Sequence, residues 1–175
     1  MGIELLYPLL IIILYNAIYL REYWEGRGFK KAILLLSVFF TQFLPIIFKI
    51  FFENTIEPII LPGMSIGIIG ILIILHSKKI MGEHFKMAYL DNKPKELVTK
   101  GTFKYIRHPI YLGNILAVIS LSILTPNIVS ISFLFINSSI MFHFIIKEEI
   151  LLEKTFNRSF FEYKKKTWKL IPFIF

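Results

Sequence analysis

The chain has 175 residues and a formal charge of +8, and 55% of its residues are hydrophobic while only 18% are charged. Soluble domains carry about 25% charged residues. The low charge and the mean hydropathy of +0.66 therefore exclude an ordinary soluble domain and indicate a membrane protein. The absence of cysteine excludes disulfides, thiolate metal sites and a cysteine nucleophile. We predict an all-α, polytopic membrane protein that forms a single domain over residues 1–175.

Five apolar stretches are candidates for membrane-spanning helices, because about 20 largely apolar residues cross the roughly 30 Å core of a bilayer. In chain order they are Gly2–Leu20, Ala32–Phe52, Ile59–Leu75, Ile110–Leu124 and Ile128–Ile146. The first lacks the basic start and the small-residue cleavage site of a signal peptide, so we interpret it as a mature helix. In the third, the spacing of Gly63 and Gly67 favours close helix packing over a ligand cavity.

The distribution of basic residues predicts the orientation of these helices. Residues 21–31, 77–109 and 147–175 hold 4, 8 and 7 of the 20 Lys and Arg residues, whereas residues 53–58 and 125–127 hold none. By the positive-inside rule the three basic segments are cytoplasmic. We therefore expect a multi-pass protein of the cytoplasmic membrane, with its N-terminus outside and its C-terminus inside. Topology and contact with anionic lipid explain the basic excess, so no nucleic-acid partner is predicted.

The cytoplasmic segment Lys95–Gly113 mixes charged, glycine and aromatic residues directly before the fourth apolar stretch. Pro109 suits the first position of a helix, where a missing N–H costs nothing. The next N–H groups lack helical partners and would bind a carboxylate or phosphate, with Arg107 and His108 as further donors. A basic-aromatic anchor at the membrane surface is an equally good interpretation of this segment alone.

Two glutamates follow the fifth apolar stretch. We expect Glu148 and Glu149 to continue the same helix, where a carboxylate pair needs either solvent or a cation. Taken alone, a solvated helix face remains the simpler interpretation. Further along, apolar residues at near-helical spacing alternate with basic ones and predict a C-terminal interfacial helix; its apolar positions are Leu151, Leu152, Phe156, Phe160 and Tyr163.

Motifs for other common site types are missing from the sequence. No two histidines have the i, i+3 or i, i+4 spacing of a metal site, so we predict no metal. The chain contains no GxGxxG, P-loop or GxSxG motif either.

Together these segments resemble the isoprenylcysteine carboxyl methyltransferase and phospholipid methyltransferase family of integral membrane enzymes. The resemblance extends from about Gly82 to the C-terminus. It is carried by the sequences Leu97–Gly101, Arg107–Gly113 (R-H-P-x-Y-x-G) and Glu148-Glu149, followed by Leu152, Phe156, Phe160, Tyr163 and Ile171-Pro172. The order and spacing of these motifs, more than any one of them, make the resemblance specific.

The resemblance implies transfer of a methyl group from S-adenosylmethionine to a lipophilic acceptor that enters from the lipid bilayer. It implies that the cofactor-binding part covers approximately residues 82–175. The cofactor-binding residues it implies are Lys95, Glu96, Leu97, Val98, Phe103, His108, Pro109, Ile110, Tyr111 and Glu148, and we assign Arg107 and Glu149 as candidate catalytic residues. The sequence departs from the family at Phe103, where tyrosine is common, and at Phe144, where an arginine often holds a substrate carboxylate.

Two other functions remain open on the sequence alone. A membrane reductase with a cytosolic nicotinamide cofactor could share a small helical architecture, and a non-enzymatic anchor or assembly protein would use the charged segments for topology only. The acceptor also stays open among a prenylated cysteine, a phospholipid, a thiol and other lipophilic molecules. The oligomeric state is not predicted.

Overall fold

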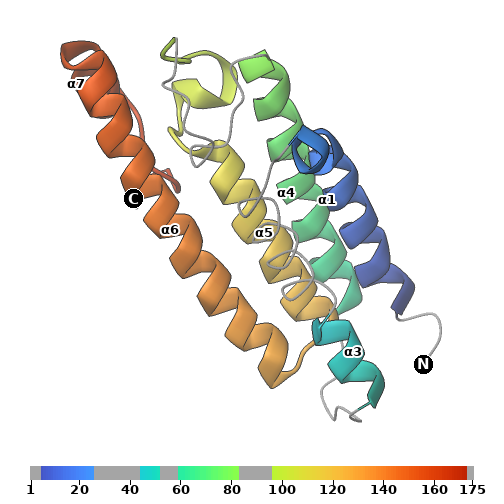
Figure 1. Cartoon of the computed structure of the whole chain (residues 1–175). Helices are drawn as coiled ribbons and strands as arrows, with labels where there is room; N and C mark the ends of the chain where they lie inside the picture. Colours follow the sequence, from blue (N-terminus) through green and yellow to red (C-terminus); the bar gives the residue numbers. More distant parts are fainter. Residues whose placement is uncertain (1–4, 26–43, 52–58, 83–95, 173–175) are drawn as a thin grey trace. The chain divides into compact units, whose positions relative to one another are not determined.

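The computed structural model describes residues 5–25, 44–51, 59–82 and 96–172 (Figure 1). The regular elements in these ranges are all helical, so the predicted all-α fold is confirmed. They are α1 (Leu6–Glu25), α3 (Leu44–Phe51), α4 (Ile60–Met81), the 3-10 helix η4 (Gly101–Lys104), α5 (Pro109–Leu124), α6 (Ile128–Phe156) and α7 (Arg158–Lys166). The predicted start of a helix at Pro109 is also confirmed.

Within the described ranges, α4 and α6 are each long and apolar enough to cross a membrane. The apolar part of α1, Leu6–Ile18, and α5 are shorter. Most of the second predicted stretch, Ala32–Phe52, lies outside the described residues, and only the eight residues of α3 represent it. The coarse expectation of apolar helices suited to a membrane is therefore confirmed, while the count of five spans stays a prediction.

The chain divides into two compact units. The first comprises Met1–Ile71 and Ile115–Asn137, and its buried core is formed by Ile11, Ile12, Ile46, Ile71, Leu121 and Leu124. A Cβ added at Gly63 would lie 2.8 Å from Leu124 Cδ2, and one at Gly67 would lie 2.5 Å from Ser120 Oγ. Ser120 Oγ also donates to the Gly63 carbonyl at 2.7 Å. The predicted close packing at the two glycines is thus confirmed.

The second unit comprises Leu72–Asn114 and Ser138–Phe175, and it contains the described residues for which a site was predicted. The predicted continuation of the fifth apolar stretch through Glu148 and Glu149 is confirmed, because α6 runs without a break to Phe156. The single C-terminal interfacial helix is corrected: Asn157 has φ +44° and separates α6 from α7. Leu151, Leu152 and Phe156 therefore belong to α6, and only Phe160 and Tyr163 belong to α7.

Candidate functional site

The segment that precedes α5 is held in place by the chain that follows α7. Arg107 N donates to the Trp168 carbonyl at 2.8 Å and His108 N to the Lys169 carbonyl at 3.1 Å, while Trp168 N donates to the Tyr105 carbonyl at 2.9 Å. These bonds form an isolated parallel bridge between Ile106 and Trp168. Residues Thr167–Leu170, which we call the return segment, therefore fix the backbone from which Arg107 and His108 project.

The Arg107 guanidinium joins three parts of this unit. Its Nε donates to Glu149 Oε1 at 2.8 Å, so it pairs with α6. Its Nη1 donates to the carbonyl of Lys164 at 3.3 Å, to the carbonyl of Thr167, and to Thr167 Oγ1 at 3.3 Å. A cation at this position stabilises the last carbonyls of α7, which have no helical partners. Arg107 thus ties α6, α7 and the return segment together.

Glu149 lies three residues beyond the apolar stretch that ends at Ile146, and its carboxylate is surrounded by cations. Its Oε1 lies 3.3 Å from His108 Nε2 as well as 2.8 Å from Arg107 Nε, and its Oε2 lies 3.5 Å from Lys169 Nζ. Burial acts to raise the pKa of Glu149, but the hydrogen bonds and charges of His108 and Arg107 outweigh burial and lower it to about 2. Glu149 is therefore ionised at neutral pH.

His108 stands between the two glutamates. Burial acts to lower the pKa of the imidazole, but the adjacent carboxylates of Glu148 and Glu149 have the larger combined effect and raise it above 6.5. The ring also makes an edge-to-face contact with Tyr111, with 5.7 Å between ring centroids. These contacts from α5 and α6 restrict the imidazole to one orientation.

Glu148 has a carboxylate oxygen that accepts no hydrogen bond within the described part of the chain. Its Oε2 lies 3.6 Å from His108 Nδ1, which is longer than a hydrogen bond. Among the residues that the structure describes, this oxygen is a buried side-chain atom with no hydrogen-bond partner. A buried acceptor without a donor is costly, by about 1–3 kcal/mol. The arrangement therefore favours a ligand that brings a donor or a positive charge to Glu148.

The 3-10 helix η4 is held by contacts on both sides. Tyr163 OH from α7 donates to the Phe103 carbonyl at 2.6 Å, and Ser77 Oγ from α4 lies 3.0 Å from Thr102 Oγ1. Gly101 has φ +57°, a conformation that favours glycine, and a Cβ there would overlap Ile80 Cδ1. The chain thus needs glycine at this position to bring η4 against α4.

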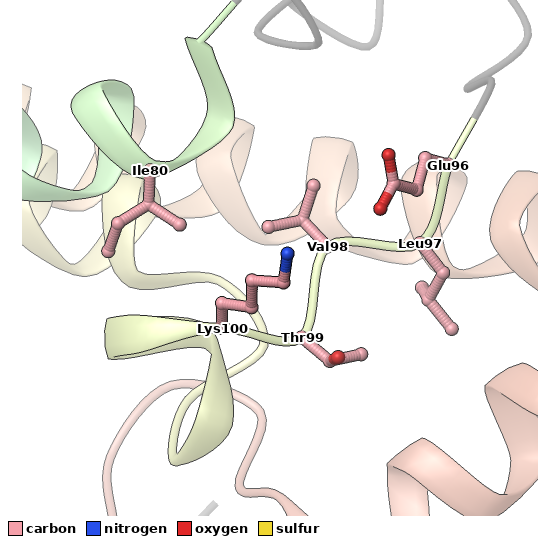
Figure 2. A pocket seen from close by; sticks show the side chains of 6 residues that line it. All are labelled: Ile80, Glu96, Leu97, Val98, Thr99 and Lys100. Carbon is pink, nitrogen blue, oxygen red and sulfur yellow. The ribbon is translucent and has the colours of Figure 1, made fainter.

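A pocket of about 170 Å³ lies beside η4 and is lined by Ile80, Glu96, Leu97, Val98, Thr99 and Lys100 (Figure 2). Figure 2 shows the side chains of Glu96, Val98 and Lys100 projecting toward Ile80, whereas those of Leu97 and Thr99 project to the other side of the segment. This alternation is expected of an extended chain. The pocket is smaller than the approximately 300–1,000 Å³ of most cofactor sites, so it has room for only part of a nucleoside cofactor.

The structure brings most of the predicted site residues into two groups within one unit. Arg107, His108, Tyr111, Glu148 and Glu149 form the charged cluster, with Pro109 and Ile110 buried at the start of α5. Glu96, Leu97 and Val98 line the pocket, and Phe103 is buried in η4. Lys95 lies outside the described residues. Within the described ranges, no group of His, Asp and Glu side chains is arranged to hold a metal ion.

Sequence reasoning missed the contribution of the return segment. Thr167 and Lys169 contact Arg107 and Glu149, the two residues assigned as catalytic, although they are distant in sequence. The sequence marks Tyr163 as an apolar helix position and as one of the residues that carry the family resemblance, but it does not predict the hydrogen bond of its hydroxyl to η4. No local pattern marks these residues, because their roles depend on the pairing of residues 105–108 with residues 167–170.

Comparison with known proteins identifies the family. A family model described as phospholipid methyltransferase matches residues 59–159, which is more than half of the chain. A protein of Dictyostelium discoideum named Protein-S-isoprenylcysteine O-methyltransferase is 37% identical over 94 residues, which cover 52% of this chain and 40% of that relative. The chain therefore matches less than half the length of that relative. The resemblance noted in the sequence is confirmed: the chain belongs to the phospholipid methyltransferase family.

Proposed function

We propose that this protein transfers a methyl group from S-adenosylmethionine to a lipophilic acceptor in the membrane. Family membership supports the reaction class and does not favour a reductase or an anchor protein. The observation that carries the proposal is Glu148 Oε2, a buried oxygen without a hydrogen-bond partner beside His108. S-adenosylmethionine has hydroxyl donors, an ammonium and a sulfonium, so its chemistry fits this acceptor.

Each group of residues has a role in binding. Glu148 would accept a hydrogen bond from a hydroxyl or an ammonium of the cofactor, and His108 would orient Glu148. Tyr111 and Phe103 would offer aromatic faces to the adenine or the sulfonium. Glu96, Leu97 and Val98 would enclose part of the cofactor at the pocket. Pro109 would set the start of α5, where the backbone N–H of Ile110 in the first turn would face the carboxylate of the cofactor.

When bound, S-adenosylmethionine supplies the methyl group that is transferred. The chain's own contribution is to hold the acceptor in line with that methyl group, within about 3–3.5 Å. The contacts of Arg107 with Glu149, Lys164 and Thr167 point to a role in holding the site together. Arg107 and Glu149 stay candidate catalytic residues, and the contacts of this buried pair by themselves support a structural role.

Calorimetric titration of S-adenosylmethionine and S-adenosylhomocysteine into detergent-purified protein tests the cofactor. We expect binding, and we expect Glu148→Gln to weaken it about tenfold or more, because a hydrogen bond to a charged group contributes about 1.5–3 kcal/mol. The matched control is Glu162→Gln, since Glu162 is exposed on α7 and pairs with Lys165. Absence of binding, or equal affinities for the two variants, would refute the proposal.

The acceptor is proposed to be a membrane lipid or a lipid-modified molecule. The described helices α4 and α6 are apolar enough to face a bilayer, and the Dictyostelium relative is named for a prenylated cysteine. Phe144 lies one turn before Glu148 and offers no charge to an acceptor carboxylate. Phe144 therefore does not indicate whether the acceptor group is a carboxylate, an amine or a thiol, and the next experiment distinguishes these three.

Transfer of a tritiated methyl group distinguishes these acceptors. Membranes, farnesylcysteine and phosphatidylethanolamine would each be incubated with labelled S-adenosylmethionine and the purified protein. Label in the organic phase that mild base converts to volatile methanol indicates a methyl ester, whereas label that stays non-volatile after the same treatment indicates an N- or S-methyl product. Label found only in water-soluble products would refute a lipophilic acceptor.

The proposed topology has five spans, an external N-terminus and a cytoplasmic C-terminus, and it can be mapped directly because the chain has no cysteine. Ile128, exposed at the start of α6, is expected outside, and Lys165, exposed on α7, is expected inside. An impermeant maleimide should label Ile128→Cys in intact cells, but Lys165→Cys only after permeabilisation. The reverse pattern would refute the orientation.

A further inference from the structure

The return segment places a lysine ammonium against the side of Glu149 that Arg107 and His108 do not occupy. Lys169 Nζ lies 3.5 Å from Glu149 Oε2, whereas Arg107 Nε and His108 Nε2 both approach Oε1. Each oxygen of the carboxylate therefore faces a positive charge. Since two contacts on different oxygens fix the plane of a carboxylate better than contacts on one, Lys169 restricts rotation of Glu149.

The backbone of Lys169 is anchored independently of its side chain. Its carbonyl accepts a hydrogen bond from His108 N at 3.1 Å. On either side, Trp168 forms backbone hydrogen bonds with Tyr105 and Arg107, and Leu170 is buried. Replacement of the ammonium would therefore remove its charge while leaving the scaffold of the return segment in place.

We propose that Lys169 is a positioning residue for the candidate cofactor site, acting through Glu149. Its ammonium holds the Glu149 carboxylate against His108, and the imidazole in turn stays directed at Glu148. The ligand in this inference, S-adenosylmethionine, rests on the proposed function; the arrangement of the four side chains rests on the described contacts.

His108 is the group in which this positioning can be measured. Glu148 and Glu149 face it from α6, the Tyr111 ring faces it from α5, and Arg107 precedes it on its own segment. If the Lys169 ammonium holds the Glu149 carboxylate against His108, its loss lets the carboxylate turn away from the imidazole. The imidazolium then loses part of its stabilisation and the pKa of His108 should fall, whereas removal of a charge without any loss of positioning would raise it.

The first experiment follows the His108 imidazole by NMR titration in the ligand-free protein. Lys169→Met should shift the titration downward by about 0.5 pH unit or more, whereas Lys169→Arg should leave it near the wild-type value; an upward shift would show only the loss of a charge and would overturn the inference. The matched control is Lys165→Met on α7, because Lys165 pairs with exposed Glu162 and lies over Phe161. An unchanged titration in Lys169→Met, or an equal shift in Lys165→Met, would overturn the inference.

The second experiment measures binding of S-adenosylhomocysteine to the same variants. Lys169→Met should weaken binding about fivefold, with Lys169→Arg within about twofold of wild type and Lys165→Met unchanged. A melting temperature of Lys169→Met close to that of wild type would show that the loss is not one of folding. If the wild type binds no ligand, the proposed function fails, while the His108 titration still decides the role of Lys169. Wild-type affinity in Lys169→Met would overturn that role.

Discussion

Gly101 provides a test of the packing that places η4 against α4. Its φ of +57° costs alanine about 1–2 kcal/mol relative to glycine. A Cβ would also overlap Ile80 Cδ1 and lie 3.1 Å from Ile80 Cγ1. Because Cδ1 is the end of a half-buried side chain that can turn aside, this overlap adds only about 1 kcal/mol. We therefore expect Gly101→Ala to lower the free energy of unfolding by about 2–3 kcal/mol.

Gly82 supplies the matched control, because its φ is +52° and a Cβ there would have no neighbouring atom of the described residues within 4 Å. Gly82→Ala should incur only the backbone cost, about 1–2 kcal/mol. For a chain of this length 1 kcal/mol corresponds to about 2–4 °C, so thermal melting in detergent should separate the two variants by a few degrees.

Ile80→Val removes the overlapping Cδ1 atom and completes the test. In the Gly101→Ala background it should recover part of the lost stability, although alone it should cost about 0.5–1.5 kcal/mol. Equal melting temperatures for Gly101→Ala and Gly82→Ala, or no recovery in the double variant, would refute the packing described for η4.

Three further predictions concern the charged cluster and its support. Arg107→Met should lower the free energy of unfolding by about 3 kcal/mol, measured by thermal melting in detergent, because it leaves the buried Glu149 carboxylate with fewer cations; a loss below about 1 kcal/mol would contradict the ion pair. Because folding lowers the pKa of Glu149 to about 2, its ionised carboxylate stabilises the fold above about pH 4.5, and this stabilisation is lost as the pH falls toward 2. Because folding raises the pKa of His108, its imidazolium stabilises the fold below about pH 6.5, and this stabilisation is lost as the pH rises through the raised value. Melting followed against pH should show both losses, and His108→Gln should abolish the alkaline one; a wild-type alkaline limb in that variant would contradict the assignment. Tyr163→Phe should cost about 1 kcal/mol in thermal melting by removing the hydrogen bond to the Phe103 carbonyl, and no change would indicate that the bond is not formed.

Features that depend on neighbouring residues in the sequence could be predicted well. Pro109 begins α5 because its fixed φ suits the first helical turn, and α6 continues through Glu148 because nothing after Ile146 breaks the helix. The break at Asn157 was not predicted, although asparagine is among the few residues other than glycine that adopt positive φ readily. The apolar residues on both sides of Asn157 have near-helical spacing, so the sequence pattern predicted one continuous helix there.

Features that depend on distant parts of the chain could be predicted only where the family resemblance implied them. The motif Arg107-His108 and the pair Glu148-Glu149 were expected to share a site because of the family resemblance, and the contacts of His108 with both glutamates bear out their proximity. The sequence gives no sign that Arg107 also binds the end of α7, since those acceptors are backbone carbonyls whose positions depend on tertiary structure.

The family match ends at residue 159, before α7 is complete and before the return segment begins. A fragment cut at that boundary would keep the motifs Arg107-His108 and Glu148-Glu149 and would still lose the carbonyls of Lys164 and Thr167 that accept from Arg107. It would also lose the strand-like partner of residues 105–108. A fragment that preserves the charged cluster must therefore extend beyond residue 159, where the family match ends. Fragments for study should retain the chain through at least Leu170.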